Sequence, residues 1–103
     1  SEFIKVATKS EIADGEKILV EADDRLVILF RVGEDFHCLD DVCTHDGGTL
    51  SDGEHNACMI KCPRHGAEFD IRTGTALCMP ATEPTAVHDV KVDGEDILVK
   101  INE

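Results

Sequence analysis

Two short stretches, Cys43-Thr44-His45 and Cys62-Pro63-Arg64-His65, decide how this sequence is interpreted. Together they form the pattern C-x-H-x16-C-x-x-H, so each stretch places one thiolate and one imidazole on a single tight loop. Two such loops that face each other supply two sulfur and two nitrogen ligands to a centre between them. Glycines at 47, 48 and 66 follow the pairs and allow backbone N–H groups to approach a sulfide or thiolate closely.

The region around these pairs differs from the rest of the chain. Residues 40–84 contain all three prolines, four of the five cysteines and most of the glycines, with few long apolar runs. We expect a loop-rich segment with a weak hydrophobic core of its own, which a bound ligand rather than apolar burial holds in place.

Both flanks carry short apolar or alternating segments that are typical of β-strands. These segments are residues 3–7, 17–20, 25–32, 36–39, 86–92 and 97–101. The run at 25–32 is long enough for a strand buried on both faces, and turn residues at 33–35 and 93–96 predict two hairpins. A single helical turn is expected within residues 8–14. The sequence therefore predicts a small all-β fold.

Composition restricts the class of partner. The 103 residues include 10 Lys and Arg against 22 Asp and Glu, a formal net charge of −12, and 42% are hydrophobic. The hydrophobic content supports a folded domain, whereas the negative charge disfavours nucleic acid and anionic membranes. No apolar stretch approaches the ~20 residues of a membrane span. An odd number of cysteines without an export signal favours a reducing cytoplasm.

The two Cys/His pairs and their surroundings resemble those of Rieske-type [2Fe–2S] ferredoxins, in particular the ferredoxin components of bacterial ring-hydroxylating dioxygenase systems. The segment 62–70 and the following Arg72-Thr73-Gly74 also fit this family, and the resemblance covers almost the whole chain. It implies a small antiparallel β-sandwich, with residues 1–103 as a single Rieske domain and a cluster-binding subdomain at about 40–84. It also implies that Cys43 and Cys62 bind one iron of the cluster while His45 and His65 bind the other.

The same resemblance implies a function. The protein is expected to be a soluble one-electron carrier that docks transiently with a ferredoxin reductase and with a terminal oxygenase, and not an enzyme by itself. Gly48 and Arg64 occupy positions where high-potential Rieske proteins carry a disulfide, and Ala67 and Phe69 replace their Ser and Tyr. We therefore expect a reduction potential near the lower end of the Rieske range, about −150 mV.

Two other functions remain open at this stage. Two Cys and two His also suit a structural zinc site, although zinc sites more commonly pair Cys with Cys and His with His along the chain. Within electron transfer, a Rieske-like subunit of another oxidoreductase, such as the small subunit of a nitrite reductase, has the same cluster motif.

The remaining candidate residues receive ordinary structural roles. Cys38, Cys58 and Cys78 are expected to be small hydrophobic residues, since Cys58 could replace Cys62 only by abandoning its pairing with His65. We expect three histidines on strands or at the surface, namely His37, His55 and His88. We expect three acidic residues on solvated surfaces, namely Asp40, Asp41 and Glu54. Residues 77–81, which include Pro80, resemble the loop that covers the cluster in this family, with an ordinary turn as the alternative.

Overall fold

The computed structural model describes residues 2–42, 49–62, 66–78 and 84–102. Within these residues, one 3-10 turn (η1, Lys9–Glu11) accompanies ten β-strands. The strands are β1 (Ile4–Thr8), β2 (Lys17–Ala22), β3 (Arg25–Val32), β4 (Asp35–Asp40), β5 (Glu54–Asn56), β6 (Met59–Lys61), β7 (Glu68–Asp70), β8 (Ala76–Cys78), β9 (Val87–Asp93) and β10 (Asp96–Lys100). The all-β prediction and the single helical turn are confirmed.

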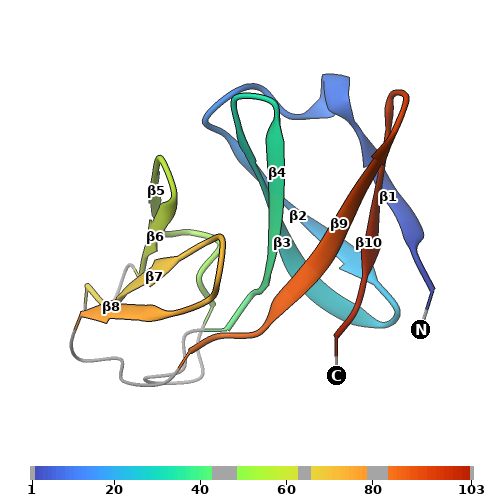
Figure 1. The fold of residues 1–103 in the computed structure, drawn as a ribbon. Helices are drawn as coiled ribbons and strands as arrows, with labels where there is room; N and C mark the ends of the chain where they lie inside the picture. The colour runs from blue at the N-terminus through green and yellow to red at the C-terminus, as the bar shows by residue number, and fades with distance from the viewer. Residues whose placement is uncertain (1, 43–48, 63–65, 79–83, 103) are drawn as a thin grey trace.

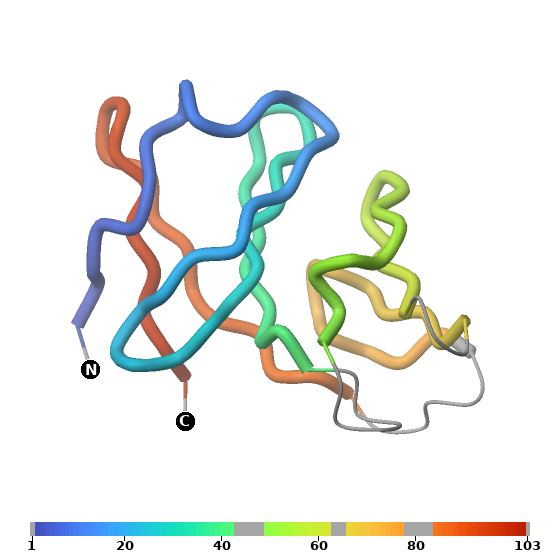
Figure 2. The backbone as a smooth tube through the Cα atoms, turned by 180° about the vertical axis from the view of Figure 1, so that it is seen from behind, coloured from blue at the N-terminus to red at the C-terminus, as the bar shows by residue number. Residues whose placement is uncertain are grey.

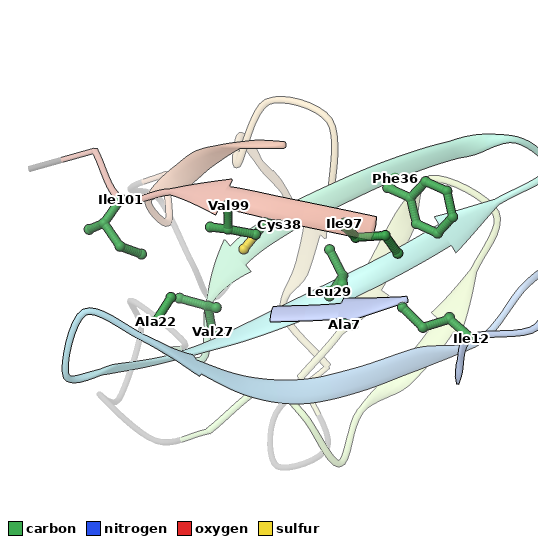
Figure 3. Close-up of a cluster of buried hydrophobic side chains, with 10 residues drawn as sticks. All are labelled: Ala7, Ile12, Ala22, Val27, Leu29, Phe36, Cys38, Ile97, Val99 and Ile101. Carbon is green, nitrogen blue, oxygen red and sulfur yellow. The ribbon is translucent and has the colours of Figure 1, made fainter. Parts of the chain in front are cut away.

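Six strands form one antiparallel sheet in the order β1-β10-β9-β4-β3-β2, which we call the body. The sheet curls until β1 approaches β2, and it encloses a core of aliphatic side chains with one phenylalanine (Figures 1 and 3). The buried members are Ala7, Ile12, Ala22, Val27, Leu29, Phe36, Cys38, Ile97, Val99 and Ile101. Burial of these side chains is the main stabilising contribution to the body.

Both predicted hairpins are present, and each has a two-residue turn. Val32 pairs with Asp35 across the turn between β3 and β4, and Asp93 pairs with Asp96 between β9 and β10. A third hairpin joins β2 to β3 through Asp23 and Asp24, with φ angles of 53° and 62°. Two consecutive residues with positive φ are the geometry that matches the right-handed twist of paired strands.

Strand β3 is buried on both faces, as its continuous apolar sequence predicts. Val27 and Leu29 point into the core of the body, whereas Ile28 and Phe30 point to the opposite side. All four side chains are fully buried. Because successive side chains alternate across a strand, β3 contributes to two separate cores at once.

The second core belongs to the segment between β4 and β9, which we call the insert. Its strands form a four-stranded antiparallel sheet in the order β5-β6-β7-β8, set beside the body (Figures 1 and 2). Its buried residues pack with Ile28, Phe30 and Leu39 of the body; they are Leu50, Ile60, Cys62, Ala67, Phe69 and Ile71. The expectation that apolar burial does not hold this segment was therefore wrong for these residues, because short paired strands bury their apolar side chains against the outer face of β3 and β4. The core is shared with the body, in agreement with the expectation that the segment has only a weak core of its own.

Two histidines lie where the insert meets the body. The ring of His55 on β5 contacts Phe30 edge to face, with 5.0 Å between ring centroids, and its Nε2 donates to the Ala57 carbonyl at 2.7 Å. Burial lowers the pKa of His37 on β4, and Asp35 partly offsets that effect. Arg72 and Asp70 of the insert also act on His37, so charges from both parts of the molecule meet at this seam.

Candidate metal centre

Among the four predicted ligands, Cys62 lies within the described residues. Cys43, His45 and His65 lie outside them, as do residues 79–81 of the predicted covering loop. Leu77, the residue on the near side of that loop, is on β8 with 51% of its surface exposed. The described residues contain no group of three or more His, Cys, Asp or Glu placed to hold a metal ion. The described residues that lead into and out of the three predicted loops define the edges of the site.

Cys62 follows β6 directly and is 1% exposed. Its backbone N–H donates to the Ala67 carbonyl at 2.6 Å, and the Gly66 N–H donates to the Cys62 carbonyl at 3.1 Å. Gly66 has a φ of +76°, a conformation that glycine adopts without steric cost. The second Cys/His stretch thus starts and ends on two hydrogen bonds between the ends of β6 and β7.

The first Cys/His stretch begins beside a buried carboxylate. Asp41 is 7% exposed, and its Oδ1 accepts hydrogen bonds from the backbone N–H groups of Leu50 and Ser51, both at 2.7 Å. Its Oδ2 accepts a hydrogen bond from the Ser51 hydroxyl at 3.0 Å. The prediction that Asp41 is a solvated surface residue was wrong, because the chain returns at residues 50 and 51 and covers it.

The predicted covering segment returns to the body through Thr85. This buried residue donates its N–H to the Gly74 carbonyl at 2.8 Å and its hydroxyl to the Val42 carbonyl at 3.0 Å. Gly74 has a φ of +78°, and a Cβ at this position would overlap the Thr85 carbonyl and contact Val87. Thr85 therefore joins the last residue before the first Cys/His stretch to the turn between β7 and β8.

The insert is attached to the body where β4 pairs with β9. The Asp40 N–H donates to the Ala86 carbonyl at 2.9 Å, and the Asp40 Oδ1 accepts a hydrogen bond from His88 Nε2 at 2.6 Å. The other ring nitrogen of His88 accepts the Asn102 N–H at 3.0 Å. His88 is thus a buried strand histidine with both nitrogens satisfied, in agreement with its predicted structural role.

Two further cysteines, Cys38 and Cys58, have packing roles. Cys38 is fully buried in the core of the body, where burial above all, with Asp40 as a second cause, raises the pKa of its thiol to about 12. Cys58 is half-buried at the turn between β5 and β6 and packs against the core of the insert. Glu54 is exposed on β5, as predicted.

The surroundings of Cys62 fit an iron–sulfur cluster. Its side chain belongs to an apolar group that includes Leu50, Ala67 and Phe69, so water has little access to it from the protein side. An apolar setting disfavours an unbound thiolate and suits a thiolate whose charge a metal neutralises. The predicted donor set of two Cys and two His is also the one that a Rieske centre requires.

Comparisons with known proteins agree with this chemistry. The profile of the Rieske [2Fe-2S] domain matches residues 2–99. The 3-phenylpropionate/cinnamic acid dioxygenase ferredoxin subunit of Escherichia coli (strain K12) is 35% identical over 96 residues, which cover 91% of this chain and 89% of that protein.

Solved structures give the same result for the fold. The ferredoxin of carbazole 1,9a-dioxygenase from Nocardioides aromaticivorans IC177 superposes with a TM-score of 0.91 at 33% identity, covering 96% of this chain and 97% of that one. A chain from a complex of reduced oxygenase and oxidized ferredoxin in carbazole 1,9a-dioxygenase has a TM-score of 0.88 at 32% identity, covering 94% and 91%.

The chain belongs to the Rieske [2Fe-2S] domain family. The two ferredoxins compared above match it over nearly the full length of both chains, so the chain is an electron carrier with a Rieske [2Fe–2S] cluster and not the catalytic component of its system. This agrees with the predicted family, cofactor and role. A structural zinc module is not supported, because the relatives are redox proteins. In addition, no helix among the described residues is long and apolar enough to cross a membrane.

Proposed function

We propose that this protein accepts electrons one at a time from a ferredoxin reductase and delivers them to a terminal aromatic-ring-hydroxylating oxygenase in the cytoplasm. The observation that carries this proposal is similarity over nearly the whole chain to ferredoxins of two aromatic dioxygenase systems. One of the similar structures is a complex between oxygenase and ferredoxin, which supports direct docking as the mode of transfer. Residues 1–103 would form a single Rieske domain whose cluster-binding part spans about 40–84.

We further propose that Cys43 and Cys62 hold one iron and that His45 and His65 hold the other. The buried apolar position of Cys62 supports this assignment, as does the spacing of the two Cys/His stretches. When bound, the cluster supplies reversible one-electron chemistry. The chain supplies the ligands, excludes water around Cys62 and holds the loop ends through Asp41, Thr85 and the backbone pair of Cys62 with Ala67.

Substitution of the histidines tests this ligand set. His45→Ala and His65→Ala should each abolish the absorption and the low-average-g EPR signal of the reduced Rieske cluster, because one iron loses a ligand. Cys58→Ser is the matched control: it alters a thiol near the site that we do not assign as a ligand, and it should retain full cluster occupancy. A colourless Cys58→Ser protein, or a His45→Ala protein with the native spectrum, would show that the assignment is wrong.

The reduction potential provides a second test. Neutral imidazoles in place of two thiolates raise the reduction potential above that of all-Cys clusters, which is about −400 mV. The absence of a second cysteine pair at Gly48 and Arg64 keeps it near the low end of the Rieske range. Voltammetry should give a midpoint potential of about −150 mV. A clearly positive midpoint would contradict this explanation.

The contact with the oxygenase is best tested at the insert. Leu77 on β8 is 51% exposed, and Leu19 on β2 of the body is 47% exposed, so the two leucines form a matched pair in different parts of the molecule. Leu77→Asn should slow reduction of the oxygenase several-fold at unchanged midpoint potential, whereas Leu19→Asn should leave the rate unchanged. Equal effects of the two substitutions would place the docking surface elsewhere.

The net charge of −12 predicts how salt acts on docking. Partners with basic surfaces would be attracted at long range, and salt screens such attraction over a Debye length of about 8 Å at 0.15 M. Rates of reduction by the reductase and of oxidation by the oxygenase should both fall as ionic strength rises. Rates that do not depend on salt would show that charge attraction does not contribute to docking.

A further inference from the structure

Asp41 is a carboxylate buried inside a small protein, where removing it from water costs free energy. Its side chain is shielded from solvent by the returning chain at Leu50 and Ser51, which supply three hydrogen-bond donors to its two oxygens. Among the described residues, no Lys, Arg or His forms an ion pair with it. A buried carboxylate is costly to desolvate, and hydrogen bonds compensate that cost without cancelling the negative charge.

The position of Asp41 in the chain connects it to the proposed ligands. It stands two residues before Cys43, so the two Cα atoms are at most ~7 Å apart. Its hydrogen bonds reach residues 50 and 51, and the closed loop therefore contains both Cys43 and His45. Thr85 binds the carbonyl of the intervening Val42, so the start of this loop is fixed from two sides.

The interaction is also more than a local turn. Leu50 is fully buried in the core that contains Ile60, Phe69 and Cys62. Through the Leu50 N–H, the carboxylate thus ties the end of the first ligand loop to the apolar group that surrounds the ligand of the second loop.

We propose that Asp41 is a positioning residue for the cluster: it closes the first ligand loop, and its fixed negative charge lowers the reduction potential. This inference rests on the proposed ligand set, because it requires Cys43 and His45 to bind the cluster. Because residue 41 is bound to residues 50 and 51, the chain between them has fewer conformations open to it, so less order has to be imposed when the cluster binds. A negative charge near the cluster disfavours the additional electron of the reduced state.

Two substitutions of Asp41 separate closure from charge. Asp41→Ala removes all three hydrogen bonds, and the holoprotein should lose its cluster to a chelator several-fold faster than the wild type. Asp41→Asn keeps an oxygen in place of Oδ1 for the Leu50 and Ser51 amides and removes the charge. It should retain the cluster to within about twofold of the wild type and shift the midpoint potential to a more positive value.

Asp52 supplies the control for charge. It is exposed in the turn that follows Ser51, so Asp52→Asn makes the same change in net charge at a solvent-screened position. Its midpoint potential should shift by less than half as much as that of Asp41→Asn. Ser51→Ala, which removes one of the three hydrogen bonds, should accelerate cluster loss less than Asp41→Ala does.

Hydrogen exchange gives a readout that does not depend on electron transfer. The Leu50 and Ser51 amides should exchange at least several-fold faster in Asp41→Ala than in the wild type, since their acceptor is gone. Wild-type cluster retention in Asp41→Ala, or a wild-type potential in Asp41→Asn, would overturn the proposal. A wrong ligand set would be recognised separately, by a His45→Ala protein that keeps the Rieske spectrum.

Discussion

The body and the insert are both antiparallel β-structure, but they achieve order by different means. Strands of the body contain five to eight residues, and three two-residue turns connect β2 to β3, β3 to β4 and β9 to β10 around one apolar core. Each strand of the insert contains three residues. So few ladder hydrogen bonds hold a short strand that it depends on side-chain contacts and on the neighbouring body. Asp41 and Thr85 supply such contacts, and the outer face of β3 supplies the apolar ones.

This difference separates stability from function. The body can fold on the burial of its own apolar side chains, whereas the insert places its residues around a ligand and borrows part of its core from the body. Stability is not uniform across a structure, and sites that bind ligands commonly lie in its less stable parts.

Removing one buried side chain from each part should have unequal consequences for the cluster. Phe69→Ala in the insert and Leu29→Ala in the body should lower the free energy of unfolding by about 4 and about 3 kcal/mol, because both side chains are fully buried. Only Phe69→Ala should also accelerate cluster loss to a chelator, since Phe69 packs in the same group as Cys62. Equal acceleration in the two variants would mean that the two cores act as one.

Removal of the cluster should affect the insert far more than the body. In the apoprotein, the amides of Ile60 and Phe69 should exchange roughly 100-fold faster, which corresponds to about 2.7 kcal/mol of local stability. Amides of Leu29 and Val99, in the core of the body, should change less than tenfold. Hydrogen exchange read by NMR on both forms measures this. Uniform acceleration throughout the chain would remove the distinction between the two parts.

A strained turn in the insert offers a stabilising change. Ala57 has a φ of +50°, in the left-handed region that costs a residue with a Cβ about 1 kcal/mol. Ala57→Gly should therefore raise the free energy of unfolding by up to about 1 kcal/mol, measured by denaturant titration. Ala13 is exposed and outside the left-handed region, so Ala13→Gly should be neutral or destabilising. A gain from both substitutions would argue against relief of strain.

The seam between the two parts should give the smallest effect. Burial lowers the pKa of His37 below 6.5, so the unfolded chain binds a proton more readily than the folded protein does. His37 therefore costs stability as the pH falls through 6.5, and this cost is absent well above that pH. Because His37 is partly exposed, the contribution should stay below about 0.5 kcal/mol. Unfolding curves at pH 8 and pH 5.5 should differ less in His37→Gln than in the wild type; an unchanged difference would contradict this.

Much of the body could be predicted from its sequence, because its signals are local. The apolar run at 25–32 and the turn residues at 33–35 predict a buried strand and a hairpin from residues that are adjacent in the sequence. The turn at Asp23 and Asp24 lacks the usual glycine, so no hairpin signal marked it. Strands of three residues, such as β6 and β7, are too short to show a periodicity, and the sheet of the insert was consequently expected to be loops.

The chemistry of the site could be predicted from the sequence, whereas the hydrogen bonds that hold the ends of its loops could not. The pattern that contains Cys43, His45, Cys62 and His65 predicts the family and its cofactor from residue types and spacing, and its assignment as the ligand set stays a prediction. Asp41 was placed on a solvated surface because its burial depends on Leu50 and Ser51, which return to it from nine and ten residues away. A single sequence does not reveal such a contact, since an acidic residue before a loop is usually exposed.

Because β4 pairs with β9 in antiparallel orientation, the whole insert is the loop of one long β-hairpin. Leu39 lies opposite Val87, and the Asp40 N–H reaches the Ala86 carbonyl, so the chain leaves and re-enters the body through adjacent hydrogen-bonded residues. The length of a loop closed in this way has only a weak effect on the entropy of closure, which grows with its logarithm. The body therefore fixes the two ends of the insert and also supplies the apolar face of β3 and β4 on which the insert packs. In engineering terms, the cluster-binding part is a cassette with two fixed attachment points, whose contents can change as long as the side chains that pack on β3 and β4 are kept.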